Sequence, residues 1–164
     1  SNFICCSNWR EAAIMPTMVS TEFTFEPSIE PDSNVPLVVG QRIALGRAAL
    51  MAHLCADFHL ADYASEVLAR LDGHRDEIAV IGQVGVIGPV ALATARLHAL
   101  LGDTDAARCD LEHARQIAQR GGGVPSLLRC RLLARQLDPD ARDDDLAADA
   151  QRLGMHGVAA AARR

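Results

Sequence analysis

Apolar residues recur most regularly just after Gly102, where Ala107, Leu111, Ala114 and Ile117 follow one another at intervals of three and four residues. This spacing places all four side chains on one face of a helix. Gly102 itself can adopt the left-handed conformation that commonly ends a preceding helix. The pattern therefore predicts two helices joined by a tight turn at Gly102.

The ends of these two helices carry their own signals. The first helix is expected over residues 89–101, because Pro at a helix start lacks only an N–H that would have no partner there. Asp103 or Thr104 can cap the second helix through a side-chain oxygen. We call residues 88–121 the central hairpin, and we expect Leu111 to be buried where three helices meet.

The same periodicity extends along most of the chain. It predicts helices over residues 40–57, 60–71 and 126–137, a helix after the acidic run 143–145 with Leu146, Ala150 and Leu153 facing inward, and a short helix over residues 158–162. A single helical hairpin cannot bury its apolar face alone and needs neighbouring hairpins. The expected fold is therefore an all-α array of about three antiparallel helical hairpins.

Residues 1–39 differ from the remainder, because prolines interrupt any long helix there. We expect an extended N-terminal arm that docks partly through Trp9, Phe23 or Phe25, with a disordered leader as the alternative. The helical-repeat domain is expected to cover residues 40–164.

The turn and second helix of the central hairpin, Leu101-Gly102 followed by Ala107, Leu111 and Ala114, resemble those of a tetratricopeptide repeat. The wider run IAVIGQVGVIG followed by GPVALATARLHALLGD is similar to the C-terminal helical tail of large actinobacterial regulators. Those regulators carry an ATP-binding module with either a LuxR-type DNA-binding domain or an adenylyl cyclase domain. The resemblance covers roughly residues 41–164 and implies a tetratricopeptide-like array.

The resemblance also implies a function. It points to a non-catalytic module for protein interaction or signal reception in a cytoplasmic transcriptional or cyclase-type regulator, with no cofactor of its own. The partner would be another protein or other domains of a parent regulator. First helices line the concave surface of such arrays, so Arg96 and His98 are the expected partner contacts.

The segment HRDEIAVIGQVGVIG, residues 74–88, admits a second interpretation. Ile78–Ile81 resembles a buried strand, and Gly82, Gly85 and Gly88 precede a helix as they do in dinucleotide-binding folds. The alternative function is thus a small nucleotide-binding protein or enzyme that uses the loop 82–88. However, the glycine spacing is not GxGxxG, and no second strand is expected.

We favour a packing role for this connector. Exposed together, its large apolar side chains would form a patch that soluble monomers rarely tolerate. We therefore expect most of them to be buried against the flanking hairpins or across a homodimer interface: Ile78, Val80, Ile81, Val84, Val86 and Ile87.

Charge and cysteine content narrow the function further. The net charge of −5 gives no global attraction to nucleic acid or to an anionic membrane, and the sequence contains no apolar run long enough to span a bilayer. The number of cysteines is odd, and none of them forms a CxxC pair, which favours reduced thiols in the cytoplasm.

Three groups of polar residues have the residue types of a metal site, a catalytic pair or a nucleic-acid contact. His53, Cys55, Asp57 and His59 are metal-ligating types, Cys109 and His113 stand four apart as a thiolate–His pair would, and Arg129, Arg131 and Arg135 could form a basic stripe. We expect ordinary structural roles for all three groups, with the arginines pairing to nearby acidic residues. No catalytic, cofactor-binding or metal-binding residue is predicted.

Overall fold

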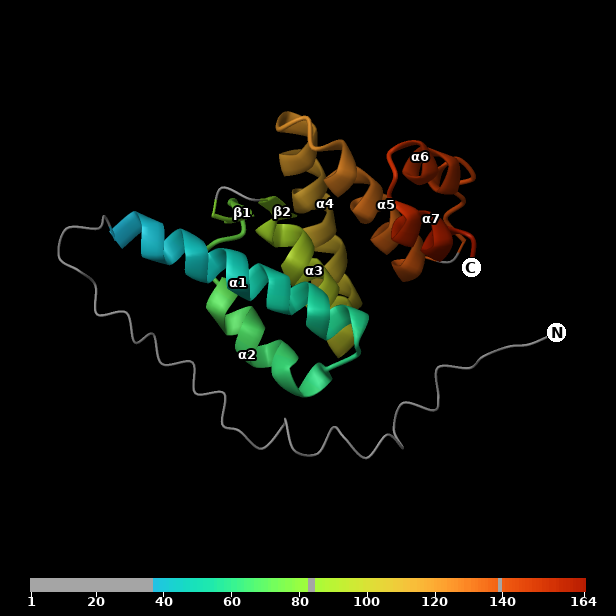
Figure 1. Ribbon diagram of the computed structural model, residues 1–164. Coiled ribbons are helices and arrows are strands. Elements are labelled where there is room, and N and C mark those ends of the chain that lie inside the picture. Colours follow the sequence, from blue (N-terminus) through green and yellow to red (C-terminus); the bar gives the residue numbers. More distant parts are fainter. Residues whose placement is uncertain (1–36, 83–84, 139) are drawn as a thin grey trace, which may run out of the picture. The chain divides into compact units, whose positions relative to one another are not determined.

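The computed structural model describes residues 37–82, 85–138 and 140–164, which all belong to one compact unit. These residues form seven helices and one two-stranded sheet (Figure 1). In chain order the elements are α1 Leu37–Asp57, α2 Ala61–Leu71, β1 Ile78–Ile81, β2 Gly85–Pro89, α3 Val90–Leu101, α4 Thr104–Arg120, α5 Val124–Leu137, α6 Leu146–Arg152 and α7 His156–Ala162. The predominantly helical class is confirmed, and the arm predicted at the N-terminus lies outside the described residues.

The turn of the central hairpin forms as its residues predict. Gly102 has a φ of 82°, and its N–H donates to the carbonyl of Ala99, which ends α3. The carboxylate of Asp103 accepts the N–H of Ala106, so Asp103 rather than Thr104 caps α4. Pro89 is the last residue of β2 and directly precedes α3, so this helix begins at Val90, one position after the predicted start.

The helices pack in chain order, each against its neighbours. Helices α1 and α2 pack against each other and against α3, α3 packs against α4, and α4 packs against α5, which carries the two short helices α6 and α7 (Figure 1). Helix α3 supplies Leu97 to the cluster shared with α1 and α2, and Leu92 to the cluster shared with α4 and α5. Leu111 is buried in that second cluster, as expected, between α3 and α5.

The connector between α2 and α3 corrects one prediction, because a second strand does follow the first. Strands β1 and β2 pair antiparallel, with Ala79 opposite Gly88 and Val80 opposite Val86. One extra residue, Ile87, therefore lies between the two pairs as a β-bulge. The glycines allow the chain to reverse and bend here: Gly82 has a φ of 52° and Gly88 a φ of 129°.

The expected burial of the connector's large side chains is also wrong within the single chain. Ile78, Ile81 and Val86 are 46%, 39% and 71% exposed, and the buried residues of this hairpin are Ala79, Gly88 and Pro89. The reason is that a two-stranded sheet has only one face to pack. That face meets α1 so closely that a side chain at Gly46 would collide with the Val80 carbonyl.

The side chains of Val80 and Ile87 are half-buried, and Val84 lies outside the described residues. A second correction falls at the C-terminal end of the chain. Leu153 is 50% exposed instead of facing inward, because α6 ends at Arg152 and Gly154 turns the chain with a φ of 70°. Leu128, which the periodicity did not single out, is buried against the short helices instead.

Candidate functional site

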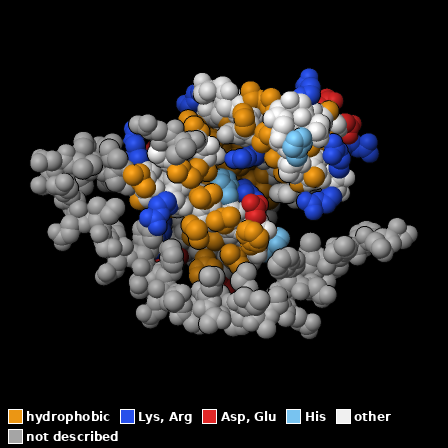
Figure 2. All heavy atoms as spheres, viewed as in Figure 1, with side chains coloured by type: hydrophobic (Ala, Val, Ile, Leu, Met, Phe, Trp, Pro, Cys, Tyr) orange, Lys and Arg blue, Asp and Glu red, His pale blue; other side chains and the backbone are white. Residues whose placement is uncertain are grey.

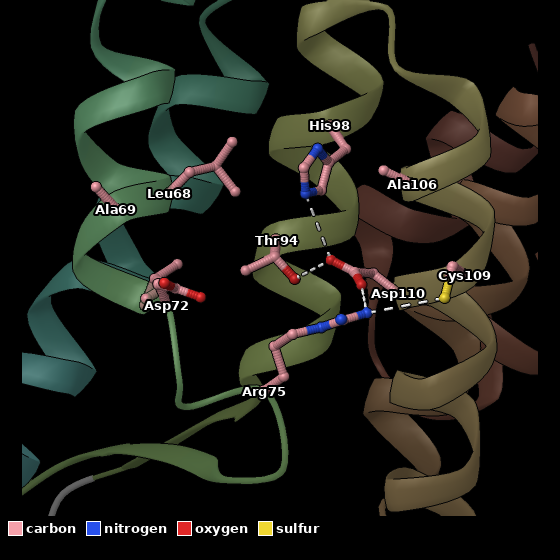
Figure 3. A pocket seen from close by; sticks show the side chains of 10 residues that line it. Leu68, Ala69, Asp72, Arg75, Thr94, His98, Ala106, Cys109 and Asp110 are labelled. Carbon is pink, nitrogen blue, oxygen red and sulfur yellow. Dashed lines mark hydrogen bonds and ion pairs between the residues drawn. The ribbon is translucent and has the colours of Figure 1, made fainter.

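A groove of about 430 Å³ lies between α2, the segment that follows it, α3 and α4 (Figure 3). Side chains of α2 form an apolar wall, and polar side chains of α3 and α4 form the floor. The lining residues are Leu68, Ala69, Leu71, Asp72, Arg75, Thr94, His98, Ala106, Cys109 and Asp110. Apolar and ionisable groups converge in this groove.

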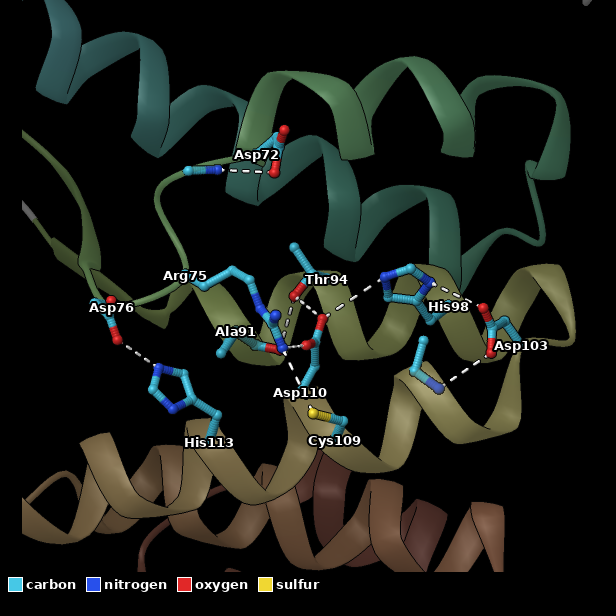
Figure 4. Close-up of polar contacts among 12 residues, drawn as sticks. Asp72, Arg75, Asp76, Ala91, Thr94, His98, Asp103, Cys109, Asp110 and His113 are labelled. Atoms are coloured by element: carbon cyan, nitrogen blue, oxygen red, sulfur yellow. Dashed lines mark hydrogen bonds and ion pairs between the residues drawn. The ribbon is translucent and has the colours of Figure 1, made fainter.

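The carboxylate of Asp110 lies at the floor of this groove and is only 4% exposed. The Thr94 hydroxyl donates a hydrogen bond of 2.5 Å to its Oδ2 atom, and Arg75 forms an ion pair with Oδ1. Nε2 of His98 stands 3.7 Å from Oδ2 (Figure 4). The buried charge is thus held by one cation and one hydroxyl, with an imidazole at the rim.

Sequence periodicity explains why Asp110 is inside. It stands three residues after Ala107 and four before Ala114, so it shares their apolar face of α4. Burying a carboxylate is costly unless it is paired and hydrogen-bonded. Arg75 supplies the pairing charge from outside the helices, and its side chain remains 46% exposed.

The segment between α2 and β1 is fastened to α4 at more than one point. The Asp76 carboxylate accepts from Nε2 of His113 at 2.7 Å, and Arg75 also lies 3.9 Å from the Cys109 thiol (Figure 4). Cys109 and His113 therefore each face the connector instead of each other. The spacing of four residues on α4 does not produce a thiolate–His pair.

The two predicted partner contacts lie in different clusters. Arg96 and His98 are two positions apart, about 200° around a helix, and so point in nearly opposite directions. His98 lies in the groove, where it is 27% exposed. Arg96 reaches α1 instead, where it pairs with Asp57 and lies 3.0 Å from Nδ1 of His53.

His53 is the buried member of the α1–α3 cluster, with 9% of its surface exposed. Its burial, reinforced by the positive charge of Arg96, lowers the pKa of the imidazole to about 4. The ring is therefore neutral at pH 7, with Nδ1 as the acceptor for Arg96. Its Nε2 atom is buried and has no hydrogen-bond partner.

The metal-ligand pattern on α1 does not assemble. The Arg96 guanidinium occupies the place between His53 and Asp57 that a cation would need. Cys55 is completely buried, and burial raises the pKa of its thiol. Within the described ranges, no three His, Cys, Asp or Glu side chains are arranged to hold a metal ion.

The arginines of α5 are all engaged by the chain itself. Arg129 donates to the Ile87 carbonyl, Arg135 donates to the Ala162 carbonyl, and Arg131 binds two carboxylates. The expected pairing is thereby confirmed for Arg131. Across the residues that the structure covers, none of the helices is both long and apolar enough for a membrane span.

The start of α3 bears on the nucleotide interpretation. The N–H of Val90 donates to the Glu77 carbonyl at 3.0 Å, and Val90 through Thr94 are buried. A phosphate would have to displace the β-hairpin to reach these N–H groups, whereas phosphate loops present theirs to an open cleft.

Asp110, Thr94 and Arg75 are the residues that sequence reasoning missed. A charged residue on the apolar face of α4 was the available signal for Asp110, while nothing in the pattern marked its two partners. Comparison with protein-family models, with curated proteins and with solved structures gave no match. The described residues thus form a mostly helical fold with a small two-stranded sheet and a buried carboxylate in a side groove.

Proposed function

We propose that this chain is a non-catalytic protein-interaction module, a tetratricopeptide-like array that serves a bacterial regulator of the transcriptional or cyclase type. Two features support the proposal. The helices pack in chain order as antiparallel hairpins, with α1 and α2 both against α3. The turn of the central hairpin also has the left-handed glycine and the side-chain cap that its repeat-like sequence predicts.

The groove is the observation that carries the proposal. Leu68 and Ala69 provide an apolar wall along which the methylenes of a long side chain can lie, and Asp110 provides a charge at the floor. Such a combination suits an arginine or lysine of a partner peptide. His98 at the rim would contact the partner as well.

Arg75 already shows that the floor accepts a guanidinium. Its ion pair with Asp110 fills the position that a partner's cation would take. Because nearly half of the Arg75 side chain is exposed and it belongs to a connecting segment, a partner can displace it without opening the core. In this proposal Arg75 competes with the partner's basic side chain for Asp110, and it keeps the carboxylate paired while the groove is empty.

Selection from a random peptide-display library tests this function. The selected peptides are expected to carry a basic residue, and Asp110→Asn should weaken their binding at least tenfold. Asp105→Asn is the matched control, because Asp105 lies on the same helix but is exposed. Arg75→Ala should strengthen binding by removing the competitor. Peptides that bind both aspartate variants equally would contradict the proposal.

A thermal-stability screen with NAD, ATP and cyclic nucleotides addresses the alternative function. A ligand at 100 times its dissociation constant stabilises a protein by about 2.7 kcal/mol, and we expect no such effect here. Gly85→Ala is a clean control, since a side chain there would meet nothing within 4 Å. A nucleotide-dependent shift that disappears in Gly85→Ala would replace the interaction proposal.

A further inference from the structure

Helix α1 has two apolar faces, and the larger side chains lie on the outer one. The inner face packs Leu45, Ala49, Ala52 and Cys55 against α2 and α3. The outer face, which we call the α1 stripe, consists of Ile43, Leu50, Met51, Leu54 and Phe58, each between 37% and 68% exposed. At 100° per residue these five fall within an arc of about 100°, so they lie on one side of the helix, where the exposed Arg47 stands between Ile43 and Leu50.

The β-hairpin extends this apolar surface. It lies against α1 at Gly46, where a Cβ atom would stand 3.7 Å from the Ile81 side chain. Ile78, Ile81 and Val86 are exposed on this hairpin. In Figure 2 hydrophobic side chains gather over the face that α1 and α2 present. Clustered exposure of this kind marks interaction surfaces on otherwise soluble proteins.

The opposite end of the array lacks such a surface. Helices α6 and α7 bury their small apolar residues and expose Arg152, His156 and Arg163. Helical-repeat arrays need polar outer faces on their terminal repeats to stay soluble. The C-terminal end of this array meets that requirement, whereas the α1 end presents the kind of face that repeats use for stacking.

We propose that the α1 stripe is the interface with a second copy of this chain, packed around a two-fold axis with the two α1 helices antiparallel. Head-to-tail stacking would need an apolar face at both ends of the array, and among the described residues only the α1 end presents one. Pairing of like ends uses the same face on both copies and closes after two subunits.

Charge and area agree with this arrangement. Exposed Arg42 lies near the beginning of α1, Arg47 near its middle and Asp57 at its end, so antiparallel helices bring Arg42 of each copy toward Asp57 of the other. From the exposed fractions of the stripe and hairpin, the apolar area available is about 800 Å² per copy, for full residue areas near 200 Å². Stable interfaces bury roughly 800 Å² per partner.

The mass of the chain in solution tests this inference without reference to the groove. Light scattering coupled to size exclusion, at roughly 1 to 100 μM, is expected to give twice the chain mass at the upper concentrations. The variant Leu50→Glu/Leu54→Glu should be monomeric with an unchanged circular dichroism spectrum. Leu153→Glu is the matched control, because Leu153 is equally exposed at the other end of the array, and it should remain dimeric.

Disulfide trapping tests the two-fold geometry. The stripe is centred near Met51, which should therefore approach its own copy across the axis. With Cys5, Cys6 and Cys109 changed to Ser, Met51→Cys is expected to form a covalent dimer on mild oxidation, whereas Leu153→Cys should not. A monomer at every concentration, an open-ended series of larger species, or equal trapping at both positions would overturn the inference. A monomer whose stripe binds another protein's helices would overturn it too.

Discussion

The two ends of this helical fold are stabilised by different interactions. At the C-terminal end, Arg131 bridges Asp143 at 2.5 Å and Asp149 at 2.6 Å, and so ties α5 to the loop before α6 and to α6 itself. Helices α6 and α7 have only seven residues each, too few to be stable alone. They close around Leu146, which is fully buried.

At the other end, α1 is long and is held mainly by apolar packing, to which the Arg96–Asp57 ion pair with α3 adds. It packs small residues inward, which lets it approach α2, α3 and the β-hairpin closely, and it leaves large apolar side chains outside. The comparison teaches that ion pairs can hold short terminal helices in place. A long terminal helix can remain ordered while its outer face is apolar. The following predictions test that contrast.

The largest expected effect lies between the two ends. Leu111→Ala should lower the free energy of unfolding by about 2–5 kcal/mol, because it removes buried methyl groups where α3, α4 and α5 meet. Urea unfolding followed by circular dichroism measures this loss. Leu153→Ala, at a half-exposed site, should cost less than about 0.5 kcal/mol. A comparable loss in both variants would show that the core is assigned wrongly.

Mild acid should lower the free energy of unfolding first through His53 on α1. The pKa of His53 is lowered to about 4 in the folded chain from 6.5, so the unfolded chain binds the proton more readily. Stability is therefore complete above about pH 6.5 and falls as the pH drops toward 4, by about 2 kcal/mol at pH 5.

Denaturant titrations at pH 7 and pH 5 measure this loss, and His53→Gln should reduce it. The C-terminal end responds in a lower window. Arg131 holds the pKa values of Asp143 and Asp149 below 3.8, so the stability they contribute is present above that pH and is lost only below it. If His53→Gln retained the full loss at pH 5, another group would be responsible.

Removing the ion pairs of Arg131 should lower the free energy of unfolding moderately. Arg131→Ala is expected to cost about 1–2 kcal/mol, because two carboxylates lose a shared and partly buried partner. Hydrogen exchange should become faster in α6 and α7 and stay unchanged in α1. Arg152→Ala, whose side chain is 78% exposed, is the control and should change little.

The smallest effect is expected on the α1 stripe. Leu50→Gln should change the unfolding free energy of the monomer by less than about 0.5 kcal/mol, since Leu50 is 41% exposed. Leu45→Ala, on the inner face of the same helix, should cost about 2–4 kcal/mol. Both are measured at low micromolar concentration. Equal losses would mean that the outer face is packed within the chain.

Part of the candidate site could be found in the sequence. His98 was identified from its place on the first helix of the central hairpin, and Asp110 could have been, because a carboxylate on an apolar helix face requires a partner. Arg75 could not, since it lies 35 positions before Asp110 and meets it only because the connector folds back onto α4. Thr94 carries no signal apart from the carboxylate it binds.

The sequence by itself determined most of the helices and the turn between α3 and α4. The signals involved are local: apolar residues at helical spacing, a glycine at position 102 that tolerates positive φ, and the capping carboxylate of Asp103. Because each acts over only a few residues, each can be recognised from the sequence alone. The tertiary structure alone decided which face of α1 is inside. Both faces are apolar, and the face with the smaller side chains is the buried one. The reason is that α2, α3 and the connector can approach a helix closely only where its side chains are small.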